Sequence, residues 1–590
     1  MGTVLGVERS VSGRLWRERL EDWSLATKLA QTHGLPEIVA RVLAARGVTA
    51  GLVETFLKPT LRALLPDPSR LRDMDRAAGR LARAIETGEA VAVFGDYDVD
   101  GATSAALLHR FFKAAGRPLR LYIPDRMREG YGPNAPALRR LKDEGVRLVV
   151  TVDCGITAYA PLAEAAEIGL DVIVVDHHVA EAELPRAVAV VNPNRLDESG
   201  ALRQLAAVGV AFLLAVAVNR ELRGAGWWTQ SRPEPDLLDC LDLVALGTVC
   251  DVVPLTGLNR ALVTQGLKVM AGRRSTGLAA LADAARLTER PGAFHCGFLL
   301  GPRVNAGGRV GDAELGVRLL TSEDPAEAAA IAQRLDRLNE ERRAIEQTML
   351  EEAIGALEAE AEPGAKLAFV ARRGWHAGVI GIVASRVKER YALPAVVAAI
   401  EEDGTAKGSG RSVRGVDLGS AVLAARQSGL LINGGGHAMA AGFTARAEDL
   451  PALKAFLSER LARQIDEGGF VPTLGIDGVL QPGGATVELT QILEQVGPFG
   501  AGNAEPRFAF PAVRLTKAEP VGENHVRCIL IGSEGGRLKA IAFRALGTPL
   551  GDALLQARGA AIHLAGHLRA DIWQGQATTQ LLIEDAAAVA

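Results

Sequence analysis

The sequence predicts an α/β protein in which two α/β regions, joined by one long helix, precede a small β-barrel. Three observations support this class. Short apolar runs alternate with helical stretches between Glu89 and Asn192, a charged helical segment begins near Pro325, and alternating apolar runs dominate after Phe470. The chain has 590 residues, which is too many for one hydrophobic core.

The first region is expected to hold a parallel sheet. Its apolar runs, at residues 90–94, 148–152 and 172–175, are continuous rather than alternating, as in strands covered on both faces. The stretches 102–115 and 158–168 have helical composition and are long enough for right-handed crossovers. An Asp-containing turn follows each run, so these turns are expected at the carboxyl ends of the strands, where such sheets bind ligands.

The long helix is expected at residues 325–360, a segment dense in interleaved charge that we interpret as solvated. The second α/β region follows, with Gly-rich turns expected at 408–410 and 434–436, and about five barrel strands come last. The predicted parts are an N-terminal helical segment (1–65), the first α/β domain (66–320), the connecting helix (321–362), the smaller α/β domain (363–468) and the barrel (469–590).

Composition gives weaker constraints. The net charge is -4, so no basic excess points to nucleic acid. Five cysteines without CxxC spacing favour a reducing compartment. Charged residues interrupt the first 20 positions, so we expect no signal peptide there, and the apolar stretch 205–218 is too short to span a bilayer. We expect a cytoplasmic protein without a membrane partner.

Acidic residues after the first run indicate a metal site. Asp96, Asp98 and Asp100 lie within five positions, where mutual repulsion makes it costly to ionise all three unless a cation is bound. Turn and helix-capping roles would explain a single Asp. Three of them in alternation, followed by Gly101, favour the metal.

Four further side chains extend this site. Asp153 and the pair His177 and His178 follow the next two runs, and Asp251 ends another apolar segment. Carboxylates with one or two imidazoles suit Mn²⁺ or Mg²⁺ better than structural zinc. Two such ions ~3.5–4 Å apart can share a carboxylate and activate a bridging water for attack on phosphorus. The pattern therefore predicts phosphoester hydrolysis.

The motifs that carry these residues resemble a known superfamily. GDYDVDGATS, VTVDCGIT, VVDHH and LGTVCDVVPL resemble, in order, the four motifs of the DHH phosphoesterases, and GWHAGVIGIVASRV, GSGRS and NGGGHAMAAGF resemble their DHH-associated domain. FLLGPRVNAGGRVGDA, the long helix and PFGAGNAEPRF before the barrel resemble the bacterial members that degrade single-stranded DNA from 5' to 3'. The resemblance implies a DHH catalytic domain, a DHH-associated domain and an OB-fold barrel.

The same resemblance implies roles for the acidic cluster. Asp153 is expected to bridge two ions of Mn²⁺ or Mg²⁺, and His178 to stabilise the phosphoryl charge or the leaving oxygen. The other expected ligands are Asp96 and Asp98 at one ion and Asp100, His177 and Asp251 at the other. The implied activity is release of 5'-mononucleotides in DNA repair and recombination.

Other residues are candidates for holding the strand. Guanidinium groups match phosphate oxygens bidentately, and glycines allow close backbone approach. Solvated arginines, tight turns and a turn tyrosine are the structural alternatives. The candidates are Arg303, Asn305 and Arg309 around a flexible Gly pair, Ser409, Arg411 and His437 in the second α/β region, and Tyr131, which is placed to stack on a base.

The expected partner is single-stranded DNA, threaded by a monomer through a groove too narrow for a duplex. A single-strand-binding protein and a helicase are further candidate partners. One alternative is a DHH phosphodiesterase acting on short oligonucleotides or cyclic dinucleotides, but such relatives lack the barrel at 470–590. Another is a metal-free relative that binds DNA or replication proteins, but it is expected to have lost ligands that this chain retains.

Overall fold

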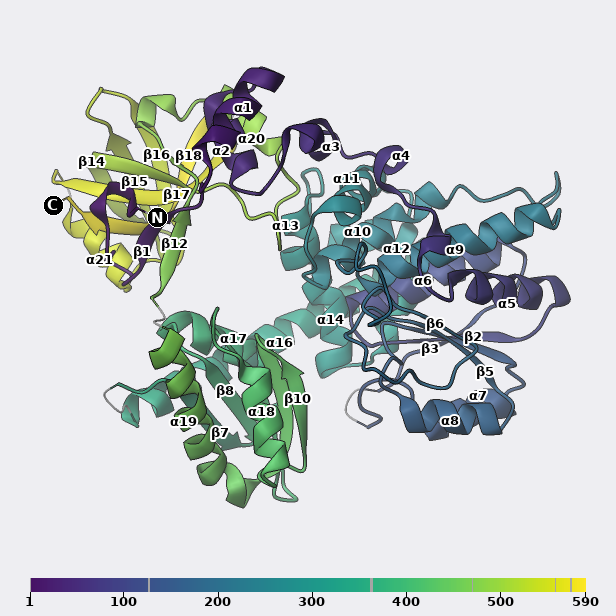
Figure 1. Ribbon diagram of the computed structural model, residues 1–590. Coiled ribbons are helices and arrows are strands. Elements are labelled where there is room, and N and C mark those ends of the chain that lie inside the picture. Colours follow the sequence, from purple (N-terminus) through teal and green to yellow (C-terminus); the bar gives the residue numbers. More distant parts are fainter. Residues whose placement is uncertain are drawn as a thin grey trace. The chain divides into compact units, whose positions relative to one another are not determined.

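The computed structural model describes residues 2–125, 128–360, 364–468, 471–557, 559–573 and 576–589. Its elements are labelled in Figure 1. The chain forms two compact units. The first unit comprises Met1–Gly308, Ala313–Gln333 and Thr473–Ala590, and the second Arg309–Asp312 and Arg334–Pro472.

A five-stranded parallel sheet organises the half of the first unit that precedes the barrel, with strand order β3-β2-β4-β5-β6. Helices lie on both faces (Figure 1), which explains why β2 and β4 are buried along their whole length. The strands are β2 (Val91–Gly95), β3 (Arg120–Tyr122), β4 (Leu148–Val152), β5 (Asp171–Val175) and β6 (Ala189–Val191). The surrounding helices are α5 (Met74–Thr87), α6 (Val99–Ala114), α7 (Ala135–Asp143), α8 (Tyr159–Glu167) and α9 (Ala207–Gly224). The predicted parallel sheet is confirmed.

Further helices complete this half of the unit. Gly307 and Gly308 lie inside a helix, so the expectation of a flexible Gly pair is wrong. A Cβ on Gly308 would lie 2.8 Å from Tyr97 O, and the glycine thus lets the helix approach the acidic loop. The helices are α10 (Leu241–Cys250), α11 (Gly257–Ala271), α12 (Thr276–Ala284), α13 (Ala293–His295), a π-helical turn (Cys296–Leu300), α14 (Gly301–Val310) and α15 (Glu314–Thr321).

The barrel closes through pairing of β14 with β17 and of β16 with β18. The N-terminal segment joins its core: β1 (Leu15–Glu18) pairs in parallel with β12 (Thr473–Ile476), and Trp16 Nε1 donates to Asp585 Oδ2 over 3.0 Å. The barrel strands are β13 (Gly478–Val479), β14 (Phe508–Val521), β15 (His525–Ile531), β16 (Arg537–Ala542), β17 (Ala561–Trp573) and β18 (Gln576–Ala588). The helices packed with them are α1 (Trp23–His33), α2 (Glu37–Ala44), α20 (Val487–Glu494) and α21 (Pro549–Gln556), and α3 (Val53–Leu57) and α4 (Leu61–Leu64) lead toward α5.

The second unit contains a mixed sheet of order β10-β11-β9-β8-β7. Both Gly-rich segments lie in strands, so the expectation of turns there is wrong. Gly408 has a packing reason, because a Cβ would lie 2.0 Å from the Phe443 ring. The strands are β7 (Ala368–Arg373), β8 (Ala395–Ile400), β9 (Thr405–Arg411), β10 (Asn433–His437) and β11 (Ala440–Arg446), and the helices are α17 (Ile380–Tyr391), α18 (Leu418–Gln427) and α19 (Leu450–Gly468).

The predicted long helix is present as α16 (Pro325–Ala359). It is not solvated all round, because Ala332, Leu335, Met349 and Ala353 form part of a buried stripe. This stripe was hidden by the dense charge on the other faces. Within the described part of the chain, every helix is too short or too polar to cross a bilayer.

Candidate metal centre

Three adjacent strands deliver aspartates to one edge of the parallel sheet. Asp96 follows β2, Asp153 follows β4 and Asp176 follows β5, each one residue after its strand ends. These strands are neighbours and run in the same direction, so the three carboxylates gather at their carboxyl ends. The predicted position of the acidic cluster is therefore confirmed.

The first acidic loop also caps a helix. Asp98 Oδ1 accepts from the backbone N–H groups of Asp100 (2.9 Å) and Gly101 (3.1 Å) in the first turn of α6. A Cβ on Gly101 would lie 2.4 Å from Asp96 O, so only glycine fits this tight turn. Capping uses only one oxygen of Asp98, and the structural and metal-binding interpretations are therefore compatible.

Asp100 is held by a second helix. Its two carboxylate oxygens accept from Ala207 N (2.7 Å) and Val208 N (2.9 Å), the first residues of α9. The side chain is 1% exposed. Backbone donors at a helix N-terminus stabilise a negative charge, so they orient this carboxylate toward the cluster.

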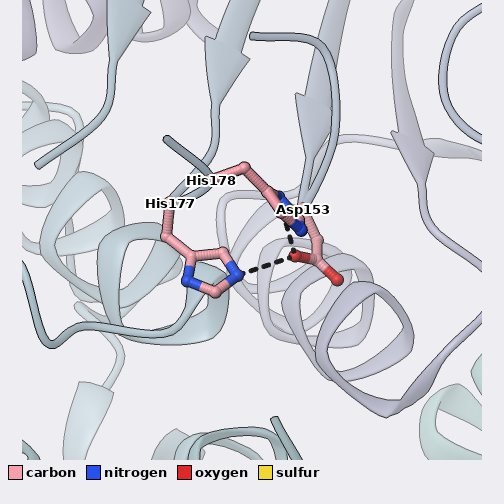
Figure 2. A group of neighbouring side chains, drawn as sticks. All are labelled: Asp153, His177 and His178. Carbon is pink, nitrogen blue, oxygen red and sulfur yellow. Dashed lines mark ion pairs between the residues drawn. The ribbon is translucent and has the colours of Figure 1, made fainter. Parts of the chain in front are cut away.

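His177 lies at the centre of the cluster. Its Nε2 is 3.3 Å from Asp153 Oδ1, 3.5 Å from Asp251 Oδ2 and 3.9 Å from Asp100 Oδ2. Figure 2 shows His177 and His178 both directed at Asp153. Among the described residues, no hydrogen-bond partner satisfies His177 Nε2, Asp153 Oδ1 or Asp251 Oδ2, although all three atoms are buried. Buried polar atoms that face one another without partners fit a bound cation.

The pKa values of these groups support the same conclusion. Burial and the neighbouring carboxylates raise the pKa of Asp153 well above its usual range, that of Asp251 to about 9 and that of Asp100 to about 7. Burial lowers the pKa of His177 to about 4, so its imidazole is neutral and offers a lone pair. A divalent cation favours the charged carboxylates and takes the imidazole as a ligand.

The ligand atoms fall into three overlapping groups, each with all atoms within 4.8 Å of one another. Asp153 belongs to two of them, and a shared carboxylate is what a two-ion site requires. The groups are Asp96, Asp98 and Asp153; Asp100, His177 and Asp251; and Asp153, His177 and His178.

Asp176 is a residue that the sequence interpretation missed. It is fully buried, and its Oδ1 accepts from His177 N (2.7 Å) and His178 N (3.1 Å) and lies 2.8 Å from His178 Nδ1. Burial is the largest single influence and opposes its ionisation, but the hydrogen bond to His178, the nearby imidazoles and the bond from Ile156 N together lower the pKa of Asp176 to about 2. Burial likewise opposes charge on His178, yet Asp176 raises the His178 pKa. The strand-end rule that located Asp96 and Asp153 also identifies Asp176.

Tyr131 acts at the same site through its hydroxyl group. The hydroxyl donates to Asp153 O over 2.9 Å and lies 3.3 Å from His178 Nδ1. Asp153 has a φ of 61°, a backbone conformation that non-glycine residues seldom adopt. The hydroxyl thus helps to hold the strained peptide of a central carboxylate. Tyr131 is 50% exposed, so its ring is accessible at the surface.

The second unit brings together some of the predicted phosphate-binding residues. Arg411 Nη1 donates to Ser409 Oγ over 3.0 Å on β9. A Cβ on Gly381 would lie 3.0 Å from Arg411 Nη2 and 3.1 Å from Ser409 Oγ, so the glycine lets the first turn of α17 pack closely against this pair. Arg309 Nη1 donates to Gly378 O over 3.1 Å, and His437 is exposed at the end of β10.

The two other candidates lie on α14 in the first unit. Arg303 is 7% exposed and Nη1 donates to Leu299 O over 2.6 Å, while Asn305 is half-buried. The Arg303 contact is a structural one inside the helical region. Both side chains are therefore less exposed to solvent than they would be in a solvated loop.

Comparison with known proteins gives the family. Three family models match in the expected order: the DHH family N-terminal domain at residues 90–248, the DHHA1 domain at 364–463 and the RecJ OB domain at 476–585. The single-stranded-DNA-specific exonuclease RecJ of Salmonella typhimurium is 37% identical over 563 residues, which cover 93% of this chain and 96% of that protein. The chain belongs to the RecJ family. Its RecJ relative in Escherichia coli is 36% identical with the same coverage, and the one in Bacillus subtilis is 36% identical over 97% of this chain and 70% of its own length.

Solved RecJ structures share the fold. RecJ of Thermus thermophilus in complex with Mn²⁺ has a TM-score of 0.79 and 32% identity, covering 96% of this chain and 78% of that chain. RecJ of the same organism in complex with Mg²⁺ has a TM-score of 0.74 and 30% identity, covering 96% of this chain and 77% of that chain. The predicted fold class, a parallel-sheet DHH domain, a second α/β domain and an OB barrel, is confirmed.

Proposed function

We propose that this chain is a metal-dependent exodeoxyribonuclease that degrades single-stranded DNA from 5' to 3' and releases 5'-mononucleotides. Its RecJ relatives are single-stranded-DNA-specific exonucleases. The observation that carries the proposal is the convergence of His177 Nε2, Asp153 Oδ1 and Asp251 Oδ2, which are buried and have no hydrogen-bond partner among the described residues. Carboxylate and imidazole ligands at the carboxyl ends of parallel strands suit phosphodiester hydrolysis.

Two ions of Mn²⁺ or Mg²⁺ are the proposed cofactors, and Thermus thermophilus RecJ binds each of these metals. When bound, such ions lower the pKa of a water molecule and neutralise charge on the phosphoryl group. Asp153 is the proposed shared ligand. The remaining proposed ligands are Asp96 and Asp98 for one ion and Asp100, His177 and Asp251 for the other.

The protein's own groups then position the reacting atoms. Asp176 holds His178 through Nδ1, which leaves Nε2 to bind the phosphoryl oxygen or the leaving oxygen. The raised pKa of His178 keeps a proton on this ring for that contact. Tyr131 holds the Asp153 peptide, and its exposed ring remains a candidate for stacking on a base.

Strand-binding groups are proposed for each unit separately. Ser409 and Arg411 lie together beside Gly381 in the first turn of α17, a setting suited to a phosphate. The other proposed contacts are Arg303, Asn305, Arg309 and His437. We further propose that the enzyme acts as a cytoplasmic monomer in DNA repair and recombination, with a single-strand-binding protein and a helicase as candidate partners.

The test is digestion of single-stranded and duplex DNA labelled at the 5' or the 3' end, with and without Mn²⁺. We expect labelled mononucleotide first from the 5'-labelled single strand, and only with Mn²⁺. Asp153→Ala is expected to abolish this release while strand binding stays measurable. Asp552→Ala, at an exposed position on α21, is the matched control. Normal turnover by Asp153→Ala would refute the two-ion site, and equal digestion of duplex DNA would refute the strand preference.

A further inference from the structure

Two phenylalanine rings lie exposed on the helical part of the first unit. Phe294 on α13 is 54% exposed and Phe298 in the following π-helical turn is 68% exposed. Their rings stack with centroids 5.1 Å apart and an angle of 25° between the planes. Large apolar side chains usually lie inside a protein, and single π-helical turns are frequent at functional sites. An exposed aromatic pair on such a turn indicates a binding surface.

The pair lines a groove of about 1200 Å³ within the first unit. One part of this groove is formed by Cys250 and Val252, the neighbours of the proposed ligand Asp251, and Val252 is itself 70% exposed. Another part is formed by the barrel, where Arg569 Cζ lies 5.7 Å from the centroid of the Phe294 ring. The groove therefore extends from the residues beside the metal centre to the barrel.

Cationic side chains accompany the rings. Arg569 is paired with Glu505 over 3.1 Å, and Arg507 is paired with Glu584. Lys268, whose Nζ donates to Gln265 Oε1 over 3.3 Å, and Arg290 also line the groove, together with Glu494. Neither cation forms an ion pair with any residue that the structure describes. Flat apolar faces beside unpaired cations match a chain of bases and phosphates. This combination of rings and cations suits an apolar protein segment less well, because such a segment has no negative charges to pair with the cations.

We propose that this groove binds the unpaired nucleotides that follow the cleaved bond. A base stacks on the Phe294–Phe298 pair, and Lys268 and Arg290 contact phosphates of the strand. The inference rests on the proposed nuclease function and adds a reason for the strand preference. Bases in a duplex stack on one another, so only an unpaired base offers a free face to the rings.

The first test measures binding of a 5'-phosphorylated single strand to the metal-free protein by fluorescence anisotropy. Stacking on an aromatic side chain contributes about 1–3 kcal/mol per base, so Phe298→Ala is expected to weaken binding about 5- to 150-fold. Phe294→Leu, which keeps an apolar side chain, serves as a second variant in case Ala disturbs the turn. Phe543→Ala is the matched control, because Phe543 is 56% exposed on the barrel outside this groove.

The second test locates the base. A single abasic site is moved along the strand, and we expect one position at which loss of the base weakens binding to the wild-type protein. In the Phe298→Ala variant, where the ring is already absent, the same abasic site is expected to weaken strand binding little further. Equal abasic penalties in both proteins, or unchanged strand binding in both phenylalanine variants, would overturn the proposal and assign the groove to an apolar protein segment.

The third test concerns the cations. Lys268→Gln and Arg290→Gln are each expected to reduce the dependence of log Kd on log salt concentration by about 0.7, the value for one phosphate contact to a single strand. An unchanged slope in both variants would refute the phosphate contacts. Failure of the nuclease proposal is recognised separately, because wild-type protein would then release no nucleotide with Mn²⁺ whatever the binding results.

Discussion

Two buried aspartates of the first unit, Asp477 and Asp153, have different surroundings. Asp477 in the barrel half is fully buried, and it accepts from Arg19 Nη1 (2.8 Å), Arg46 Nη1 (3.1 Å) and Arg507 N (2.9 Å). Asp153 at the sheet edge is 2% exposed and faces other carboxylates and a neutral imidazole. A buried carboxylate that is paired with guanidinium groups has a structural role. A buried carboxylate that faces other carboxylates is repelled by them, and a bound cation is needed to offset that repulsion.

The barrel aspartate is the place where a substitution is expected to cost most stability. Asp477→Asn removes the charge that compensates Arg46, whose side chain is only 9% exposed. Breaking a buried ion pair in this way costs about 3–5 kcal/mol. Hydrogen exchange of the amides in β12 and β14 measures the loss locally. Unchanged protection there would show that the arginines find other partners.

The equivalent change at the sheet edge is expected to have the opposite sign. Asp153→Asn removes one of several carboxylates that burial and mutual repulsion make costly to ionise. The metal-free variant is therefore expected to melt at a higher temperature than the metal-free wild type. Added Mn²⁺ is expected to raise its melting temperature much less. A fall in stability like that of Asp477→Asn would remove the distinction between the two sites.

Metal loading tests the acidic cluster as a whole. The folded-state pKa values of Asp100 and Asp251, about 7 and about 9, lie above those of an unfolded chain. The metal-free folded state therefore holds protons that the unfolded state has lost, and its stability falls as the pH rises from about 4 to about 9. At pH 8, Mn²⁺ at 100 times its Kd is expected to stabilise the protein by about 2.7 kcal/mol.

The same loading is expected to release protons, because the metal takes ionised carboxylates. Titration calorimetry in two buffers of different ionisation enthalpy measures this release. Identical binding enthalpies in the two buffers would contradict the raised pKa values.

Asp176 combines features of both sites, since it is buried in the cluster but satisfied by hydrogen bonds. Asp176→Asn leaves the metal ligands in place and removes the charge that orients His178, which is expected to lower kcat about 10- to 100-fold. The alkaline limb of the pH profile of kcat is expected to move to lower pH, because Asp176 raises the pKa of His178. A purely structural role would reduce the amount of folded enzyme without moving that limb.

The sequence was sufficient for the elements whose signal is local. The continuous apolar runs predicted β2, β4 and β5, and the parallel pairing of these strands then brought Asp96 and Asp153 together as expected. Charge in α16 predicted the helix but not its buried stripe, because the dense charge on the other faces masked the apolar positions.

The sequence was insufficient where a contact depends on packing between distant segments. The backbone N–H groups at the start of α9 donate to the Asp100 carboxylate, which lies 107 residues away in the sequence from the first of them. No local sequence pattern predicts these hydrogen bonds. The glycines of β9 resembled turn residues, but Gly408 is required by the Phe443 ring on the neighbouring strand. The sequence of the N-terminal segment contains no candidate functional residue. The segment instead helps to complete the barrel core through contacts such as that of Trp16 with Asp585.

The smallest effect is expected from Tyr131→Phe, which separates the two roles of this residue. The change removes the hydrogen bond to Asp153 O and keeps the ring, so any stacking on a base is preserved. One such bond is worth about 0.5–1.5 kcal/mol, which corresponds to a loss of about 2- to 12-fold in Mn²⁺ affinity or in kcat. Tyr159→Phe is the matched control. The Tyr159 hydroxyl also donates to a backbone oxygen, Glu183 O, with a hydrogen-bond length of 3.0 Å, but neither residue belongs to the acidic cluster.

Strand affinity distinguishes the outcomes. Tyr131→Phe is expected to leave the Kd for a single strand unchanged, whereas Tyr131→Leu removes the ring as well and is expected to weaken strand binding. If Tyr131→Phe weakened strand binding and spared Mn²⁺ affinity and kcat, the hydroxyl would belong to the substrate contacts. The strained Asp153 peptide, with its φ of 61°, would then be held by the strand-end turn alone. If only Mn²⁺ affinity and kcat fall, the cluster depends on a neutral hydroxyl for its geometry, while Asp477 is held directly by charged partners.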